Sequence, residues 1–296
     1  MINKQEIIKS LQKLGVKAGD ILNLKVSVKS IGEIEGGIST LLEAFIELVG
    51  KDGTLVCDSF VEPFYSFLKP IKQDRVSLPT SKSYAGYFAN YMLQHPEAYR
   101  STHPVQAFTA IGKKAKALTE EFNKNSAPYG FLRKMADLGA KNLRVGDVNK
   151  VVGVGTTHVA ICELGFWQLS LPKGIYYKEN GEKKFFKRYW ANGCPKGFNN
   201  LIPLYYKGGA VLGEGKLGDT ETLLTSMSGT LKIEKELFVQ NPSAFLCNDK
   251  ACTNCSFTWE NSKYSFTSCL SENLKRKKYD KAMLAVAIKL VGHKHI

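Results

Sequence analysis

The sequence has 296 residues, of which 41 are Lys or Arg and 27 are Asp or Glu, so its formal net charge is +14. A hydrophobic content of 44% is typical of a globular chain and excludes a disordered or fibrous one. The N-terminal residues contain no apolar signal-peptide core, and no stretch of 18 apolar residues occurs, so we expect a cytoplasmic protein without a membrane span.

Alternating helices and strands are predicted from the start of the sequence. Asn3 and Glu6 have the spacing of a helix-capping box, and a helical repeat of apolar residues continues to Leu14. The run at 21–28 predicts a buried strand, and a second helix at 41–49 leads into another strand. This alternation predicts an α/β layered sandwich with a mixed central sheet and helices on both faces.

The same alternation continues further along the chain. Residues 84–94 have the apolar spacing of a helix, whereas 105–111 and 148–154 are apolar runs that predict strands. Near the C-terminus, residues 279–291 place apolar side chains on one face of a predicted helix.

A hairpin is predicted after Gly165, where the pattern changes. Asn180-Gly181 lies between aromatic runs, which is the strongest short-range signal for a β-hairpin, and we interpret residues 166–200 as an inserted basic hairpin. Its Lys and aromatic side chains, including Tyr177 and Lys184, could neutralise and stack on a nucleotide, although most such charge runs are solvated surface.

A glycine turn precedes the second predicted helix. Gly36 and Gly37 would leave N–H groups at the helix start free for a phosphate, and Lys25 and Lys29 nearby add positive charge. An ordinary strand-to-helix connection is the alternative interpretation.

The segment that ends at His158 is the main candidate for catalysis. An apolar run ends in Gly155-Thr156-Thr157 and presents His158 at the edge where α/β sheets usually place ligands. A histidine there can act as a general base, and Glu163 could orient its ring. A structural histidine is the alternative. Arg100 and His103 precede another predicted strand, where they could bind an anion or cap a turn.

Cysteine usage leaves several interpretations open. Seven cysteines form an odd count, which favours free thiols or a metal site over a disulfide framework. The spacing of Cys247, Cys252, Cys255 and Cys269 is compatible with a zinc site. Buried free thiols and an iron–sulfur cluster are the alternatives.

Several motifs have the order and spacing of a known family. Residues 14–20, 31–37 and 49–55 resemble the N-terminal signature of the aminoglycoside 3-N-acetyltransferase family. Residues 100–104 resemble its R-S-x-H-P segment, and 153–163 resemble its glycine-threonine-histidine-glutamate site. The interval from histidine to glutamate is five residues here, whereas three is typical of the family.

The resemblance implies an α/β layered fold and transfer of an acyl group from coenzyme A to a sugar amine. It implies His158 as the general base, oriented by Glu163, with Thr157 beside it in the catalytic segment. The residues that would bind the acetyl-CoA or other acyl-CoA co-substrate are Lys25, Ser27, Val28, Lys29, Gly36, Gly37, Phe108, Thr109 and Ala110. The residues expected at the acceptor are His103, Arg100, Tyr177 and Lys184.

Charge then decides the predicted acceptor. Aminoglycosides are polycations, whereas a chain of charge +14 favours an acceptor that bears phosphates. We therefore expect a nucleotide-linked amino sugar of surface polysaccharide biosynthesis. The alternatives are aminoglycoside acetylation and a non-enzymatic nucleic-acid-binding protein.

The expected organisation is one acyltransferase domain over 1–296. It has an α/β core at 1–165, the hairpin insertion at 166–200 and a cysteine-containing segment at 241–270. We expect a small-molecule acceptor, no nucleic-acid or membrane partner, and a homo-oligomer as a further possibility.

Overall fold

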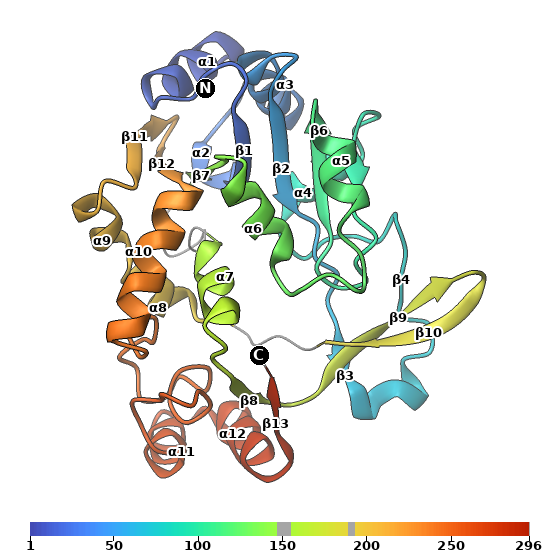
Figure 1. Cartoon of the computed structure of the whole chain (residues 1–296), viewed down its shortest axis with the longest axis vertical. Coiled ribbons are helices and arrows are strands. Elements are labelled where there is room, and N and C mark those ends of the chain that lie inside the picture. The colour runs from blue at the N-terminus through green and yellow to red at the C-terminus, as the bar shows by residue number, and fades with distance from the viewer. Residues whose placement is uncertain (147–154, 189–192, 296) are drawn as a thin grey trace.

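The computed structural model of the chain describes residues 1–146, 155–188 and 193–295 (Figure 1). A seven-stranded sheet forms its centre, with strand order β11-β12-β7-β1-β2-β6-β5. The central strand β1 is parallel to β2 and β7, whereas the outer pairs are antiparallel, so the predicted mixed sheet is confirmed. These strands are β1 (Ile21–Val26), β2 (Thr54–Asp58), β5 (Tyr99–Arg100), β6 (Phe108–Gly112), β7 (Lys141–Val145), β11 (Val211–Leu217) and β12 (Thr220–Ser226).

Helices cover the sheet, and buried apolar residues form two clusters. Successive strand residues point to opposite faces, which is why Leu55 and Cys57 of β2 belong to one cluster and Val56 to the other. The cluster of Leu55 includes α1 (Lys4–Lys13), α3 (Gly37–Val49) and α4 (Tyr87–Leu93). The cluster of Val56 includes α5 (Ala115–Glu120), α6 (Gly130–Asp137), α7 (Thr156–Glu163) and α10 (Met227–Gln240).

The remaining elements lie beside the main sheet and its covering helices (Figure 1), and several of them add buried residues to the two clusters. A small sheet contains β3 (Phe64–Tyr65), β4 (Val76–Ser77), β9 (Lys173–Glu179) and β10 (Glu182–Lys187), and β8 (Gln168–Ser170) pairs with β13 (His293–His295). The shorter or peripheral helices are α2 (Val28–Ile31), the 3₁₀ helix η1 (Ser66–Ile71), α8 (Pro195–Asn199), α9 (Ile202–Lys207), α11 (Phe266–Lys275) and α12 (Tyr279–Val291). Within the described ranges, no helix has the length and apolar character needed to cross a membrane.

The hairpin of β9 and β10 follows from its turn residues. Asn180 and Gly181 both have positive φ, at 52° and 82°, as the tight turn of a two-residue hairpin requires. The two strands pair antiparallel from Glu182 with Glu179 to Lys187 with Gly174. The hairpin projects from the core beside β3 and β4 (Figure 1).

One strand prediction needs correction, and a second falls on residues that the structure does not describe. The strand expected at 105–111 begins only at Phe108, because the N–H groups of Val105 and Gln106 donate to Nδ1 of His103 at 3.2 and 2.9 Å and form a turn. The strand expected at 148–154 lies outside the described residues. The strand before it, β7, contains Lys141 and Arg144, so its sequence does not have an apolar pattern.

One edge of the main sheet is irregular. Edge strand β11 pairs with β12 with a shift in register between Val211 and Gly213. A Cβ on Gly213 would lie 2.0 Å from the carbonyl oxygen of Leu14, so only glycine permits this approach of the edge to the end of α1. At the other edge, β5 contains only Tyr99 and Arg100.

Candidate functional site

A cavity of about 800 Å³ opens where β1 and β2 end and α7 begins. Lys25 and Val26 end β1, Asp58 ends β2, and Gly155 and His158 belong to the start of α7. Parallel strands place their carboxyl ends at one edge of the sheet, which is the usual ligand position in α/β folds. The other residues that line the cavity are Leu24, Ser27, Val28, Lys29, Cys57, Phe60, Tyr84, Ala85, Gly86, Tyr87, Phe88, Ala89, Tyr129, Leu132, Arg188, Gly193 and Phe198.

His158 is held between aromatic rings. Gly155 caps α7 at φ 81°, a left-handed conformation that glycine adopts readily, and His158 follows in the first turn. The imidazole stacks on Tyr129, with ring centroids 4.3 Å apart and planes 1° from parallel. Phe198 meets the imidazole edge-on at 4.9 Å. These contacts restrict the ring to one orientation at the cavity wall.

The surroundings of His158 favour its neutral form. Burial, and to a smaller extent the positive charges of Lys25 and Arg188, lower the pKa of His158 to about 3. The imidazole is therefore uncharged at neutral pH, the state in which a ring nitrogen can accept a proton.

The cavity also contains a buried carboxylate. Asp58 forms an ion pair with Lys25 through Oδ2, and the two side chains are only 11% and 17% exposed. Its second oxygen, Oδ1, is buried and has no hydrogen-bond partner among the described residues. An unsatisfied buried oxygen costs free energy, so this site is suited to a ligand that brings a donor.

Glu163 does not orient His158, contrary to the sequence expectation. Five residues along an α-helix correspond to a rotation of about 140°, so the two side chains leave α7 on different sides. Glu163 forms ion pairs with Arg133 and Lys235, each at 2.9 Å, and does not line the cavity. It ties α7 to α6 and α10.

Thr157 also has a different role from the one expected. It is fully buried, and its Oγ1 donates to Oε1 of Glu234 at 2.6 Å. The hydroxyl of Tyr205 donates to the same oxygen at 2.5 Å, and burial raises the pKa of Glu234 to about 7. Thr157 therefore anchors α7 to α10 behind the cavity. The sequence gives no sign of this contact, because Glu234 lies within a run of charged residues.

The expected co-substrate residues divide into two groups. Lys25, Ser27, Val28 and Lys29 line the cavity. Gly36 and Gly37 do not line it; they are exposed at the start of α3, where Ser39 Oγ donates to the Gly36 carbonyl oxygen.

The β6 residues expected at the co-substrate lie outside the cavity lining as well. The residues Phe108, Thr109 and Ala110 are fully buried and do not line the cavity. Phe108 stacks on Phe131 at 4.2 Å, and Thr109 bonds to Ser59, so these side chains serve the core.

The expected acceptor residues all lie outside the cavity lining. Arg100 donates to the carbonyl oxygens of Leu78, Pro79, Ser81 and Ser59 and so organises a loop. His103 is buried in the turn before β6, where burial lowers its pKa to about 4. Tyr177 and Lys184 lie on the hairpin, and Lys184 forms ion pairs with Glu179 and Glu182.

One of the four cysteines expected to form a metal site lies apart from the other three. Cys269 lies on α11, where its Sγ accepts from Asn273 Nδ2 at 3.5 Å. Cys247, Cys252 and Cys255 instead meet Cys194, from the segment just before α8.

The chain is similar to proteins of one known family. A family model described as aminoglycoside 3-N-acetyltransferase matches residues 24–239. Aminoglycoside N(3)-acetyltransferase III of Salmonella sp is 35% identical over 132 residues, which are 40% of this chain and 46% of that protein. The chain thus spans about half the length of the curated relatives it matches.

Solved structures share the fold. The apoenzyme of aminoglycoside acetyltransferase AAC(3)-IVa superposes with a TM-score of 0.68 at 22% identity, over 84% of this chain and 93% of that one. AAC-IIIb in a binary complex with CoASH gives 0.69 at 17% identity, over 81% and 97%.

Proposed function

Because the chain belongs to the aminoglycoside 3-N-acetyltransferase family, we propose that it transfers an acetyl group from acetyl-CoA to an amine of an aminoglycoside. The observation that carries the proposal is the imidazole of His158, which stacks on Tyr129 in the wall of a large cavity at the carboxyl ends of β1 and β2. The family and the names of the curated relatives support the reaction.

The proposed step needs a base. The neutral amine attacks the thioester carbonyl carbon, a C–N bond forms, and the C–S bond then breaks to release the coenzyme thiolate. The nitrogen becomes acidic as it bonds to carbon, and His158 accepts its proton, which can then pass to the thiolate. The stacking on Tyr129 keeps the imidazole from turning away during this transfer.

Charges in the cavity suit the two substrates differently. Coenzyme A carries phosphates, and Lys29 and Arg188 line the cavity together with Lys25. An aminoglycoside carries ammonium groups, and Asp58 Oδ1 is a buried acceptor without a partner among the described residues. The net charge of +14, which led to the expectation of a nucleotide-linked sugar, is a sum over the whole surface. The polyanionic co-substrate accounts for cations at the cavity, so they are no argument against a cationic acceptor.

One incubation distinguishes the acceptors. The purified protein is mixed with acetyl-CoA and either an aminoglycoside or a nucleotide-linked amino sugar, and products are identified by mass spectrometry while thiol release is followed. We expect acetylated aminoglycoside and an equal amount of coenzyme A. Acetylation of the nucleotide sugar alone would overturn the acceptor, and no product with either amine would overturn the reaction.

Lys29→Ala is expected to weaken co-substrate binding selectively. Lys29 is exposed at the cavity mouth, and an exposed ion pair contributes up to about 1 kcal/mol, which corresponds to about a fivefold rise in the KM for acetyl-CoA. The KM for the aminoglycoside should stay unchanged. Lys9→Ala, at an exposed lysine on α1, is the matched control. An equal rise in both KM values would contradict the assignment.

A further inference from the structure

Four cysteines from two distant parts of the chain meet in one place. Cys194 precedes α8, and Cys247, Cys252 and Cys255 lie in the turns between α10 and α11. Their Sγ atoms all lie within 4.8 Å of one another, and all four thiols are free. We propose that this cluster binds one zinc ion as a structural site.

The spacing fits tetrahedral thiolate coordination. Zinc binds cysteine sulfur at about 2.3 Å, so tetrahedral ligands lie about 3.8 Å apart. The Sγ atoms of Cys194 and Cys252 are 3.8 Å apart. Sulfurs this close surround a single ion, whereas a multi-iron cluster holds its cysteines farther apart. On binding, each thiol gives its proton to solvent and the resulting thiolate coordinates the metal.

Backbone donors already point at two of the sulfurs. Hydrogen bonds from backbone groups of Gly197 and Asp249 reach the thiols of Cys194 and Cys247. Such N–H donors orient ligands and offset the negative charge of four thiolates around one Zn²⁺. Three of the four cysteines are buried and Cys252 is partly exposed, so the ion would be shielded but within reach of solvent.

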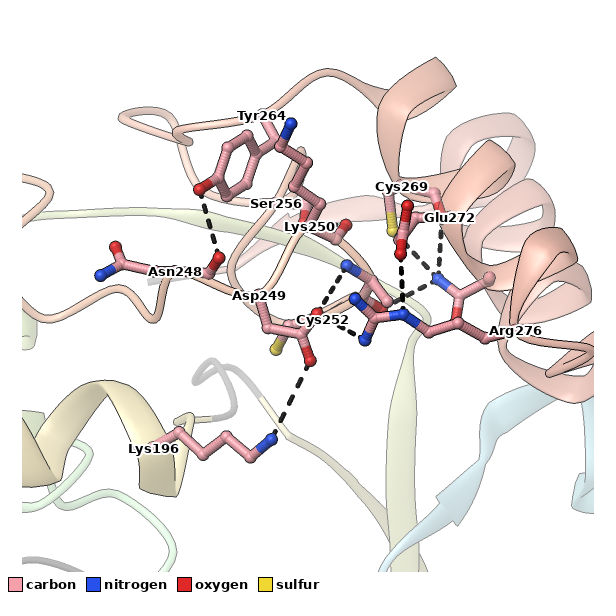
Figure 2. Close-up of polar contacts among 12 residues, drawn as sticks. Lys196, Asn248, Asp249, Lys250, Cys252, Ser256, Tyr264, Cys269, Glu272 and Arg276 are labelled. Carbon is pink, nitrogen blue, oxygen red and sulfur yellow. Dashed lines mark hydrogen bonds and ion pairs between the residues drawn. The ribbon is translucent and has the colours of Figure 1, made fainter.

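The turn that carries three of the cysteines is braced against its neighbours (Figure 2). Asp249 accepts from Arg276 of α11 at 2.9 Å and pairs with Lys196 of α8 at 3.9 Å. Tyr264 donates to the carbonyl oxygen of Asn248 at 3.2 Å. These bonds hold the thiols together before metal arrives, which lowers the entropic cost of binding.

The zinc site would also support the cavity wall. Gly193 directly precedes Cys194, and its carbonyl oxygen accepts from Asn254 Nδ2 at 3.3 Å. A Cβ on Gly193 would lie 2.7 Å from Cε1 of His158, so this segment packs closely against the imidazole. A zinc ion at Cys194 fixes the segment to the C-terminal turns and so holds it against His158.

Metal content tests the site without reference to catalysis. The full chain is purified under reducing conditions without chelator, and its metals are measured by inductively coupled plasma mass spectrometry. We expect about one zinc per chain in the wild type and in Cys269→Ser, a matched control at a buried cysteine outside the cluster. Cys194→Ser should lose most of the zinc.

Three outcomes would overturn the proposal. The first is a folded wild type that lacks stoichiometric metal and whose four cluster thiols react freely. The second is a disulfide bond within the cluster, and the third is iron bound in place of zinc. If Cys194→Ser does not fold, the wild type is loaded with Co²⁺ instead, and the visible bands of tetrahedral cobalt thiolate are expected. Their absence would equally reject the site. None of these readouts depends on acetyl transfer, so failure of the zinc site and failure of the proposed reaction can be told apart.

Discussion

His158→Ala is expected to lower kcat for acetyl transfer by about 100- to 10,000-fold, the usual contribution of a general base. The imidazole faces the cavity and is neutral because burial and two nearby cations lower its pKa to about 3. The wild-type histidine therefore stays neutral throughout pH 5 to 8, so its own titration does not change the rate in this range. Steady-state kinetics over that range, with melting temperature as a check of folding, measure both effects.

Glu163→Gln is the matched control for this experiment. Glu163 lies on the same helix, but it pairs with Arg133 and Lys235 rather than with His158. We expect a small loss of stability and an unchanged kcat. A loss of kcat comparable to that of His158→Ala would show that the carboxylate acts on the imidazole after all, and an active His158→Ala would reject the base.

The free energy of unfolding is expected to depend on pH through Glu234. Its pKa is about 7 in the folded protein and 4.5 in the reference state, so the folded state holds a proton that the unfolded state releases between these values. The folded state is thus favoured most below pH 4.5, and this advantage is lost as the pH rises through 7. At 1.36 kcal/mol per pKa unit, the loss is on the order of 3 kcal/mol.

Glu234→Gln isolates this effect. The amide oxygen can still accept from Thr157 and Tyr205, and the side chain no longer titrates. Urea unfolding at pH 5 and pH 8 should show a smaller difference between the two pH values in the variant than in the wild type. Equal differences would mean that Glu234 does not titrate in this window.

The sequence predicts the layered core well because its signals are local. The capping box of Asn3 and Glu6 and the apolar run from Ile21 identify α1 and β1, and the glycine at 155 places His158 at the sheet edge. The hairpin turn at Asn180-Gly181 is equally local. Each of these predictions depends on residues within a few positions of one another.

The errors concern contacts between distant parts of the chain. Cys194 joins Cys252 across 58 positions, and Thr157 meets Glu234 across 77, so no spacing rule identifies either pair. Glu163 fails for a different reason. Its short distance from His158 in the sequence predicts a contact between the two side chains. The rotation of the helix instead directs Glu163 away from His158, and Glu163 forms ion pairs with Arg133 and Lys235.

The irregular edge of the main sheet bears on self-association. Open strand edges invite pairing with a second copy, and proteins block this with short edges, bulges and charges. Here β11 has a register shift at Gly213 and carries Glu214 and Lys216, while the opposite edge strand has only two residues. The main sheets of two copies would therefore pair poorly edge to edge, because neither edge of this sheet offers a long regular strand.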